Sequence, residues 1–427
     1  MTAVSARPPA TAEEVSGSFA WFRSLSPQGR RAFVGAFGGY GLDAYDFQIL
    51  PLSLVAISAY FHISKGQAGL LTTVTLVVSA LGGILAGVLA DKVGRARTLM
   101  ITVGMYALFT VLCGFAANYP MLLAFRALQG LGFGGEWAAG AILVAEYAAT
   151  RYRGRTVAFV QSAWAVGWAL AVIVVTVLLD HVDHGLAWRV IFWTGALPGL
   201  FLLYLRRGVV DAPAGEGSTK ADAPKKERTP VSAVFRGGLL RTTLFATLLA
   251  TGVQGGYYTV ATWLPSYLKT TRHLSNVGTG SYLAVLIAGA FTGYVSGGYL
   301  TELIGRRKAI ALFAVPSAAI LFAYINIPAG QNQVLLLLSF PLGFFFSGIF
   351  SGFGSYLAEL YPRGVRGTGQ GFTYNTGRAL GAFFPTAVGF QAGSRGLSHA
   401  LLYGVVGYGI AIVALLGLPE TRGNELH

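Results

Sequence analysis

The stretch GVLADKVGRAR at Gly87–Arg97 returns later in the same chain as GYLTELIGRRK at Gly298–Lys308. A glycine, an acidic residue, a second glycine and an arginine recur in the same order. Every matched position in the second stretch stands 211 residues after its counterpart. The recurrence indicates that one unit of about half the chain length occurs twice.

A second pair of segments supports the same repeat. Glu146 stands seven residues before Arg153, and Glu359 stands seven residues before Arg366, with an offset of 213 between the two segments. Because two independent matches share nearly one offset, we expect two similar halves.

Composition excludes a water-soluble fold for these halves. Charged residues make up 11% of the 427 residues and hydrophobic residues make up 54%. A soluble domain carries roughly 25% charged residues. The chain also has 58 glycines, which suit the close approach of helices inside a membrane.

Apolar segments are long enough to cross a bilayer, which takes about 20 residues in a helix. The sequence predicts an all-α membrane protein with twelve transmembrane helices in two pseudo-symmetric six-helix halves. The expected spans are 31–60, 67–90, 98–118, 120–148, 155–179, 188–206, 240–268, 276–300, 308–327, 332–360, 367–392 and 397–418.

The polar stretches set the expected divisions of the chain. Residues 207–239 contain DAPAGEGSTKADAPKKERTP, a composition typical of a flexible linker. The predicted units are a cytoplasmic tail at 1–30, a half at 31–206, the cytoplasmic linker at 207–239, a half at 240–418 and a tail at 419–427.

Basic residues predict the sidedness. With a cytoplasmic N-terminus, the inward segments hold 24 of the 31 Lys and Arg residues. Five lie in outward segments: Lys65, Arg189, Lys269, Arg272 and Arg395. Since basic residues are retained on the cytoplasmic side, we expect both termini there. The net charge of +14 is spread over short loops, which argues against a nucleic-acid partner.

Enzyme and metal motifs are missing from the sequence. There is no phosphate-binding loop and no H-E-x-x-H segment. The single cysteine, Cys113, and the six histidines form no metal-ligand cluster in the sequence. We therefore expect no enzyme, no metal and no cofactor, and no signal peptide is visible at the N-terminus.

Five ionisable residues lie well inside the predicted spans: Asp43, Asp46, Arg126, Glu136 and Arg378. Each costs about 2.5–3.5 kcal/mol at a helix centre on insertion scales, so such residues are usually functional. Three acids and two bases leave one negative charge, which one proton would neutralise. This set permits the joint passage of a carboxylate and a proton.

Asp43 and Asp46 are three residues apart and share a helix face. Two close carboxylates resist ionising together, which is a useful property in a proton carrier. Alternatively, Asp46 pairs with Arg126, because both lie at similar depths. Glu136 is too far along its helix to reach Arg126, and its role stays open between proton transfer and helix packing.

Arg378 stands near the middle of its helix, where no neighbouring acid is apparent in the sequence. Its planar guanidinium suits a substrate carboxylate; the alternative is an ion pair across the two halves. Further candidate substrate contacts, for which ordinary packing is the alternative, are Arg126, Asn375, Tyr374, Gln254, Tyr257, Tyr258 and Trp137.

The repeated segments predict latches on the cytoplasmic side. Gly87 would let the second and eleventh helices approach closely, and Asp91 would face the start of the eleventh, where an anion is favoured. The alternative is that these charges only fix topology. The gating residues would be Gly87, Asp91, Arg95, Glu146, Arg153, Glu302, Arg306, Glu359 and Arg366, with Arg95–Glu146 and Arg306–Glu359 as clasps.

The Gly87–Arg95 segment, its copy, and the RALQGLG segment at 126–132 resemble the signature motifs of the major facilitator superfamily. The resemblance implies alternating access, with the first, fourth, seventh and tenth helices lining the centre. It also implies a proton-coupling role for Arg126. We expect a functional monomer surrounded by lipid.

Finer motifs are similar to those of proton-coupled organic-acid symporters of the sialate and monocarboxylate branch. They are GLDAYDF at 41–47, GGEW at 134–137 and AELYPRGVRGTG at 358–369. Aromatic-acid symporters carry a similar first-helix element, so an aromatic-acid or sugar-acid symporter is the alternative. The sequence thus predicts uptake of a small organic acid anion with protons across a bacterial inner membrane; a non-transporting receptor is a further alternative.

Overall fold

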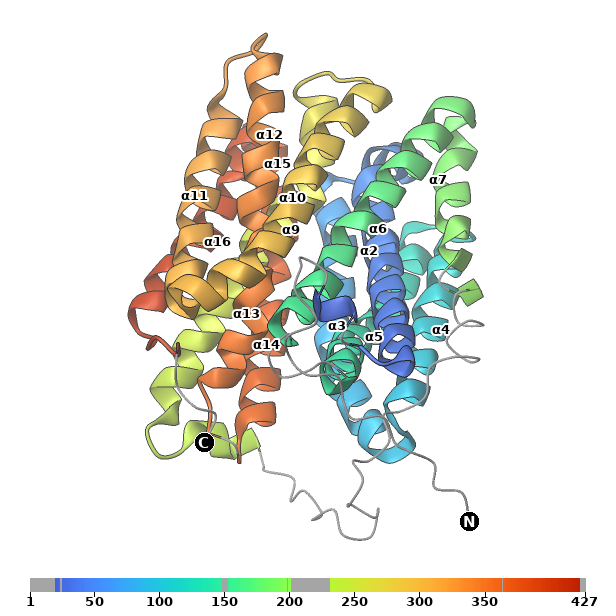
Figure 1. Ribbon diagram of the computed structural model, residues 1–427. Coiled ribbons are helices and arrows are strands. Elements are labelled where there is room, and N and C mark those ends of the chain that lie inside the picture. Colours follow the sequence, from blue (N-terminus) through green and yellow to red (C-terminus); the bar gives the residue numbers. More distant parts are fainter. Residues whose placement is uncertain are drawn as a thin grey trace.

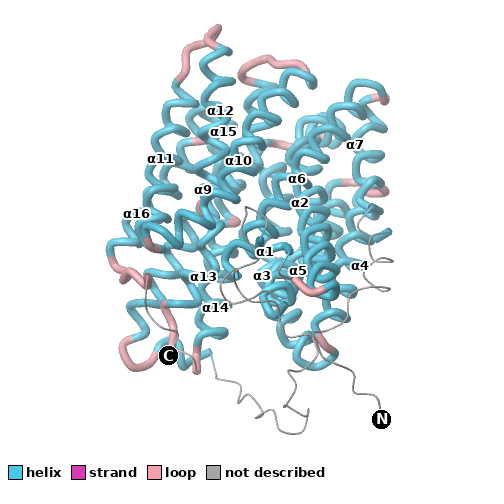
Figure 2. Tube along the Cα trace, in the orientation of Figure 1, coloured by secondary structure: helices cyan, strands magenta, loops and turns pink. Residues whose placement is uncertain are grey.

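The computed structural model describes residues 20–23, 25–147, 153–197, 199–200, 231–362 and 364–422. Within these ranges the chain is built from helices and short connections, and the ribbon has no strand (Figures 1 and 2). The side chains of 20, 90–91, 95–96, 99, 135–147, 153–155 and 184 lie outside the description.

The first bundle comprises the elements up to residue 196, at the blue and green end of the colour scale in Figure 1. Its elements are α1 Ala20–Arg23, α2 Pro27–Phe61, α3 Lys65–Val93, α4 Arg95–Cys113, α5 Tyr119–Tyr147, α6 Arg153–His181, α7 His184–Trp193 and the 3-10 helix η2 Thr194–Ala196.

The second bundle stands beside the first in Figure 1, coloured yellow to red. Its elements are η3 Val231–Phe235, α9 Leu239–Thr270, α10 Asn276–Ile304, α11 Arg306–Asn326, α12 Asn332–Gly348, α13 Phe350–Glu359, α14 Arg366–Gly381, α15 Phe383–Ala400 and α16 Leu402–Leu416. The predicted linker falls mainly outside the described residues.

The predicted spans overlap these helices; the sixth, 188–206, is described through α7 and η2, and its last residues lie outside the described part. Two other spans differ locally. The tenth predicted span is divided into α12 and α13 at Ile349, and the eleventh into α14 and α15 at Ala382. Gly396, with φ of 81°, interrupts the end of α15. The last span therefore begins at Leu397, as predicted.

Outer surfaces of the bundles are apolar. Leu337 and Leu416 are each 73% exposed, and such surfaces suit lipid rather than water. Among the described residues, six helices are long and apolar enough to cross a bilayer, and a pair bent by 75° near Leu401 adds a seventh. Helix α14, with 16 residues, is too short to cross by itself and continues into α15.

Glycines make the repeated turns possible. Gly94, between α3 and α4, has φ of 94°, and Gly305, between α10 and α11, has φ of 97°. Residues with a Cβ rarely adopt this conformation. The second glycine of the repeated motif therefore has the same backbone task in both bundles.

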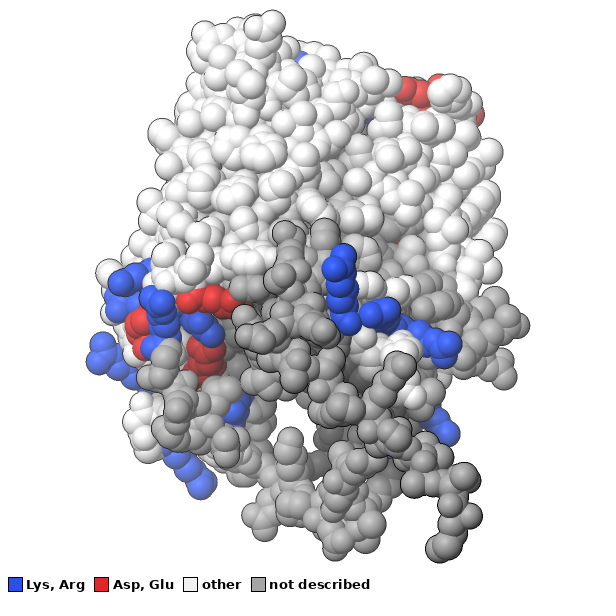
Figure 3. All heavy atoms as spheres, in the orientation of Figure 1, with Lys and Arg blue, Asp and Glu red and all other residues white. Residues whose placement is uncertain are grey.

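Helix α1, at the start of the described chain, and the end of α16 lie toward the same side of the molecule (Figures 1 and 2), which we call the termini side. Lys and Arg side chains gather there in Figure 3, whereas most of the visible surface above them carries neither. We call the other end of the bundles the opposite side. This distribution matches the asymmetry of basic residues along the sequence.

Candidate functional site

Arg378 of α14 lies between the two bundles, with 6% of its surface exposed. Its Nη2 donates a hydrogen bond to the Tyr374 hydroxyl at 3.2 Å. The guanidinium carbon lies 5.0 Å from the Tyr374 ring centre and 5.7 Å from that of Phe133, which belongs to α5 of the first bundle. The Nε atom has no hydrogen-bond partner among the described residues. One donor of the fork is therefore available for an anion.

Helix α9 supplies two of the predicted substrate contacts beside Arg378. The Tyr258 hydroxyl donates to Oε1 of Gln254 at 3.2 Å, and Nε2 of Gln254 donates to the Tyr374 carbonyl at 3.1 Å. Tyr258 also lies within electrostatic range of Arg378. We call Arg378, Tyr374, Tyr258, Gln254 and Phe133 the central cluster.

Aromatic rings of the first bundle continue this cluster. Phe47 of α2 lies 5.6 Å from Phe133, 5.7 Å from Trp164 and 6.1 Å from Tyr258, measured between ring centres. Nε1 of Trp164 donates to the Tyr257 hydroxyl at 2.5 Å. Tyr257 therefore ties α9 to α6, next to the central cluster.

Asn375, a further predicted substrate contact, lies outside the central cluster. Asn375 donates from Nδ2 to the Gly371 carbonyl at 2.9 Å, and its Oδ1 lies 3.0 Å from the place of a Cβ on Gly83. It thus packs between α14 and α3. Trp137 and Glu136 belong to α5, but their side chains lie outside the described part of the chain.

Tyr40 and Phe133 belong to this neighbourhood although the sequence reasoning missed them. Tyr40 lies in electrostatic range of both Arg378 and Asp43. Tyr40 stands three residues before Asp43 on α2, and residues three apart share a helix face. This spacing is the feature of the sequence from which Tyr40 could have been identified. Tyr40 therefore interacts electrostatically both with an acid of its own helix and with the arginine of the second bundle.

Asp46 and Arg126 belong to a separate network inside the first bundle. Thr110 of α4 donates to Oδ2 of Asp46 at 3.0 Å, and Nε2 of Gln129 donates to the Thr110 hydroxyl at 2.6 Å. Nη1 of Arg126 donates to Oε1 of Gln129. Both ionisable side chains are at most 1% exposed. Thr110 and Gln129 connect the predicted pair and were not identified from the sequence.

The structure thus divides the predicted site residues between two places. Arg126 lies with Asp46 in the network, and Arg378 lies in the central cluster with the aromatic residues. Arg126 is fully buried among α2, α4 and α5, and its Nε and Nη2 have no hydrogen-bond partner among the described residues. Its part as a substrate contact stays a prediction.

On the termini side, one predicted clasp is present. Nη2 of Arg306 lies 3.1 Å from Oε1 of Glu359, and Nε of Arg306 also donates to that carboxylate at 3.2 Å. Arg366 donates instead to the Tyr361 carbonyl, at 3.4 Å. The clasp is confirmed as a contact; its role as a latch stays a prediction.

The C-terminal tail adds a residue to this clasp that sequence reasoning missed. Glu420 accepts from the backbone N–H of Arg306 at 2.8 Å and from those of Arg307 and Lys308 at 3.4 Å. Burial raises the pKa of Glu420, but the hydrogen bonds from these N–H groups outweigh it and hold the pKa below its usual value. The signal in the sequence was an acidic residue after the last span, which carries little information by itself.

Gly87 does not fulfil its predicted role in this conformation. A Cβ on Gly87 would meet no described atom within 4 Å, so no close helix contact depends on it. Helix α3 approaches α15 much nearer the opposite side, where a Cβ on Gly69 would overlap the Pro385 carbonyl. The side chains of Asp91, Arg95, Glu146 and Arg153 lie outside the described part, and the gating role of Glu302 stays a prediction.

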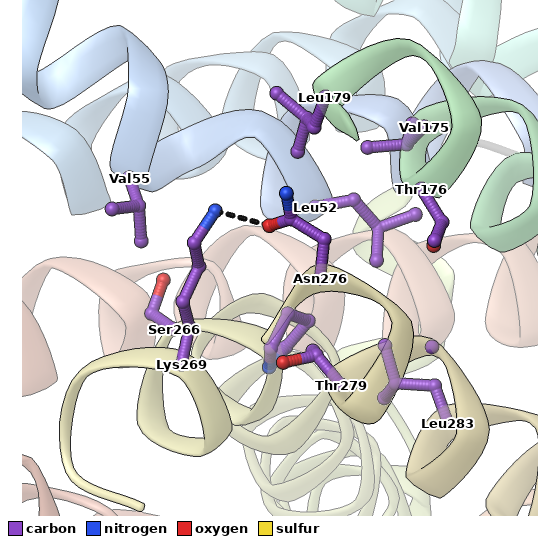
Figure 4. Close-up of a pocket in the computed structure, with 12 residues that line it drawn as sticks. Leu52, Val55, Val175, Thr176, Leu179, Ser266, Lys269, Asn276, Thr279 and Leu283 are labelled. Carbon is purple, nitrogen blue, oxygen red and sulfur yellow. Dashed lines mark hydrogen bonds between the residues drawn. The ribbon is translucent and has the colours of Figure 1, made fainter. Parts of the chain in front are cut away.

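The two bundles are in contact on the opposite side. Figure 4 shows a small pocket lined by α2, α6, α9 and α10, in which Nζ of Lys269 donates to Oδ1 of Asn276 at 2.6 Å. Nδ2 of Asn276 donates to Oδ1 of Asp180 of the first bundle at 2.6 Å. Together with the α3–α15 contact, this link joins the two bundles on the opposite side.

Comparison with known proteins identifies relatives over most of the chain. The chain is 40% identical to a probable 4-methylmuconolactone transporter of Cupriavidus pinatubonensis, over 95% of this chain and 94% of the relative. It is 30% identical to a cis,cis-muconate transport protein of Acinetobacter baylyi (87% and 90%), and 27% identical to a sialic acid transporter of Escherichia coli (93% and 96%).

Solved structures share the fold. The inward-open xylose transporter of E. coli matches with a TM-score of 0.75 at 19% identity, over 92% of this chain and 97% of that one. The family profile of the major facilitator superfamily matches residues 36–386. The chain is therefore an integral membrane transporter with the twelve-helix fold, and it belongs to the major facilitator superfamily.

Proposed function

We propose that this transporter imports a small organic acid anion together with protons by alternating access. The proposal rests on Arg378, whose buried guanidinium lies among aromatic rings of both bundles and has an available Nε donor. A planar fork recognises a carboxylate well, and a buried arginine without an anion is costly.

The aromatic surroundings favour a flat, unsaturated body on the substrate. Rings from α2, α5, α9 and α14 lie around Arg378, and π-faces pack well on planar groups. The relatives named for a muconolactone and a muconate are more similar to this chain than the one named for sialic acid. We therefore place unsaturated or ring carboxylates before sialate- and lactate-type acids.

Proton coupling would use Asp43, Asp46 and Glu136 as candidate carriers and Arg126 as their counter-charge. Asp46 is connected to Arg126 through Thr110 and Gln129. Asp43 shares with Arg378 the neighbourhood of Tyr40. A proton on Asp43 would then change the field at the substrate site directly.

The basic residues on the termini side support a cytoplasmic position for both chain ends. With that orientation, the opposite side, where these contacts join the bundles, faces outward. The conformation would then be one in which access from outside is blocked.

The test uses purified protein in liposomes with an imposed pH gradient, acid outside. The probes are cis,cis-muconate, 4-methylmuconolactone, niacin, sialic acid and lactate, each radiolabelled. We expect muconate or niacin to accumulate above its outside concentration, and a protonophore to abolish the accumulation. Liposomes with Arg378→Ala are the control.

Accumulation that persists without a pH gradient would indicate another driving force and contradict proton symport. Failure of all five acids to enter, with normal protein in the liposomes, would contradict the proposed substrate class. Preferential uptake of sialic acid would reverse the order of the two substrate classes.

A further inference from the structure

Thr110 stands where three helices of the first bundle meet. Its Oγ1 lies 3.0 Å from Oδ2 of Asp46 on α2 and 2.8 Å from the Tyr106 carbonyl on its own helix. Gln129 of α5 donates to the same Oγ1 at 2.6 Å and accepts from Arg126. Thr110 is fully buried, and Gln129 is 3% exposed.

The threonine hydroxyl has one proton and two possible acceptors. While Asp46 is ionised, Thr110 donates to its carboxylate. When Asp46 carries a proton, the carboxyl O–H donates to Oγ1, and Thr110 turns its own proton to the Tyr106 carbonyl. Oγ1 has two lone pairs, so it can accept from Gln129 in both states. The rotation of one O–H bond therefore satisfies both forms of Asp46.

The side chain is held in the rotamer that this exchange needs. A Cβ on Gly195 of η2 would overlap the Thr110 methyl group, so the methyl is packed directly against that backbone. A β-branched side chain with a packed methyl has little rotational freedom. The hydroxyl is thus kept between Asp46 and Tyr106.

We propose that Thr110 is a positioning residue for proton coupling: its hydroxyl accommodates both the ionised and the protonated form of Asp46 and holds Gln129 and Arg126 in place during the exchange. The proposal rests on the proposed proton symport. It adds a residue that neither touches the substrate nor carries charge.

The titratable and charged groups around Asp46 come from several elements. Tyr45 is its neighbour on α2, Cys113 faces it from α4 and Arg126 from α5. The Tyr45 hydroxyl is bonded to Thr194 of η2. Arg126 is thus the fixed positive charge of this group, and Asp46 is the acid whose proton the network must accommodate.

The experiment follows the carboxyl group of Asp46 by infrared spectroscopy in a pH titration of the purified full-length protein. The band of protonated Asp46 is the one lost in Asp46→Asn. In Thr110→Val, which keeps the shape but not the hydroxyl, we expect the band to move to higher frequency. We also expect its pH midpoint to rise by about 0.5–1 unit, because the ionised form loses the stronger hydrogen bond.

Two variants control the measurement. Thr110→Ser retains the hydroxyl and should restore the midpoint toward that of the unaltered protein. Thr98→Val removes a fully buried hydroxyl of the same helix, which donates to the Gly94 carbonyl at 2.9 Å. This variant should leave the midpoint unchanged. If Thr110→Val does not fold, Thr110→Ala carries the same test.

An unchanged Asp46 band in Thr110→Val, or the absence of any titrating band that Asp46→Asn removes, would overturn the role of Thr110. This readout needs no substrate. A failure of the proposed symport would instead appear as missing acid accumulation in liposomes, so the two failures are distinguishable.

Discussion

Arg126 and Arg378 are two buried arginines with opposite kinds of neighbours. The contacts of Arg126 come from α2, α4 and α5 of one bundle, whereas Arg378 on α14 faces Phe133 of the other bundle. Alternating access moves the bundles largely as rigid bodies. In the proposed cycle the surroundings of Arg126 would persist while those of Arg378 would change, which suits a proton-linked charge and a substrate contact respectively.

Replacing arginine by lysine at the two positions should have the largest effect, and the effect should differ between Arg126 and Arg378. Arg378→Lys keeps the charge but loses the planar fork. Loss of one hydrogen bond to a charged group costs about 1.5–3 kcal/mol, so calorimetry with the transported acid should show affinity about 10- to 100-fold weaker. Arg126→Lys should bind nearly normally and lose uphill uptake. The reverse pattern would move the anion site to α5.

The two aspartates of α2 should separate coupling from binding. Asp46→Asn should abolish uphill uptake, because its network is sealed inside one bundle, and leave counterflow exchange and affinity intact. Asp43→Asn should also change affinity, because Asp43 shares the neighbourhood of Tyr40 with Arg378. Uphill uptake that survives in both variants would exclude both aspartates as proton carriers and leave Glu136.

Removing the ring that faces Arg378 across the bundles should have a smaller effect. Phe133→Leu loses a cation–π contact worth about 0.5–2 kcal/mol, so affinity should fall roughly 2- to 30-fold. Phe109→Leu is the matched control, since Phe109 contacts Phe125 at 6.5 Å within the first bundle. Equal losses in both variants would mean that general packing, rather than the contact with Arg378, sets the affinity.

The smallest effect is expected at a third arginine, Arg306, which lies on the termini side rather than inside the bundles. Arg306 is 24% exposed and pairs with Glu359, and partly exposed ion pairs contribute little. Glu420, which accepts from the Arg306 backbone, should contribute about 0.3–1 kcal/mol at the start of α11. Glu420→Gln should lower the thermal stability of detergent-solubilised protein by a correspondingly small amount at pH 7.

The pH dependence of this effect has a definite sign. Because the folded-state pKa of Glu420 lies below its ordinary value, its contribution is present at neutral pH. The contribution is lost as the pH falls below about 4.3, the ordinary glutamate pKa, through the folded pKa. The unaltered protein and Glu420→Gln should therefore differ in melting temperature at pH 7 and converge under acid conditions. A difference that grows on acidification would contradict a stabilising contact of ionised Glu420 with the start of α11.

Much of the fold followed from the chain itself. Apolar segments of spanning length predicted the helices, and the 211-residue offset predicted the two halves. Arg378 and Asp46 stood out because charged residues are rare inside apolar segments. The partners of these residues could not be predicted equally well. Helical spacing shows which residues share a face of one helix, but it does not show which neighbouring helix that face contacts.

The sequence by itself determined the helices, the repeat and the positions of the buried charges, since these depend on local composition and spacing. Only the tertiary structure decided that Thr110 and Gln129 link Asp46 to Arg126, that Phe133 faces Arg378, and that Glu420 reaches the start of α11. These contacts join residues distant in the chain, and the polar and aromatic side chains that make them resemble ordinary packing residues until the helices are placed side by side.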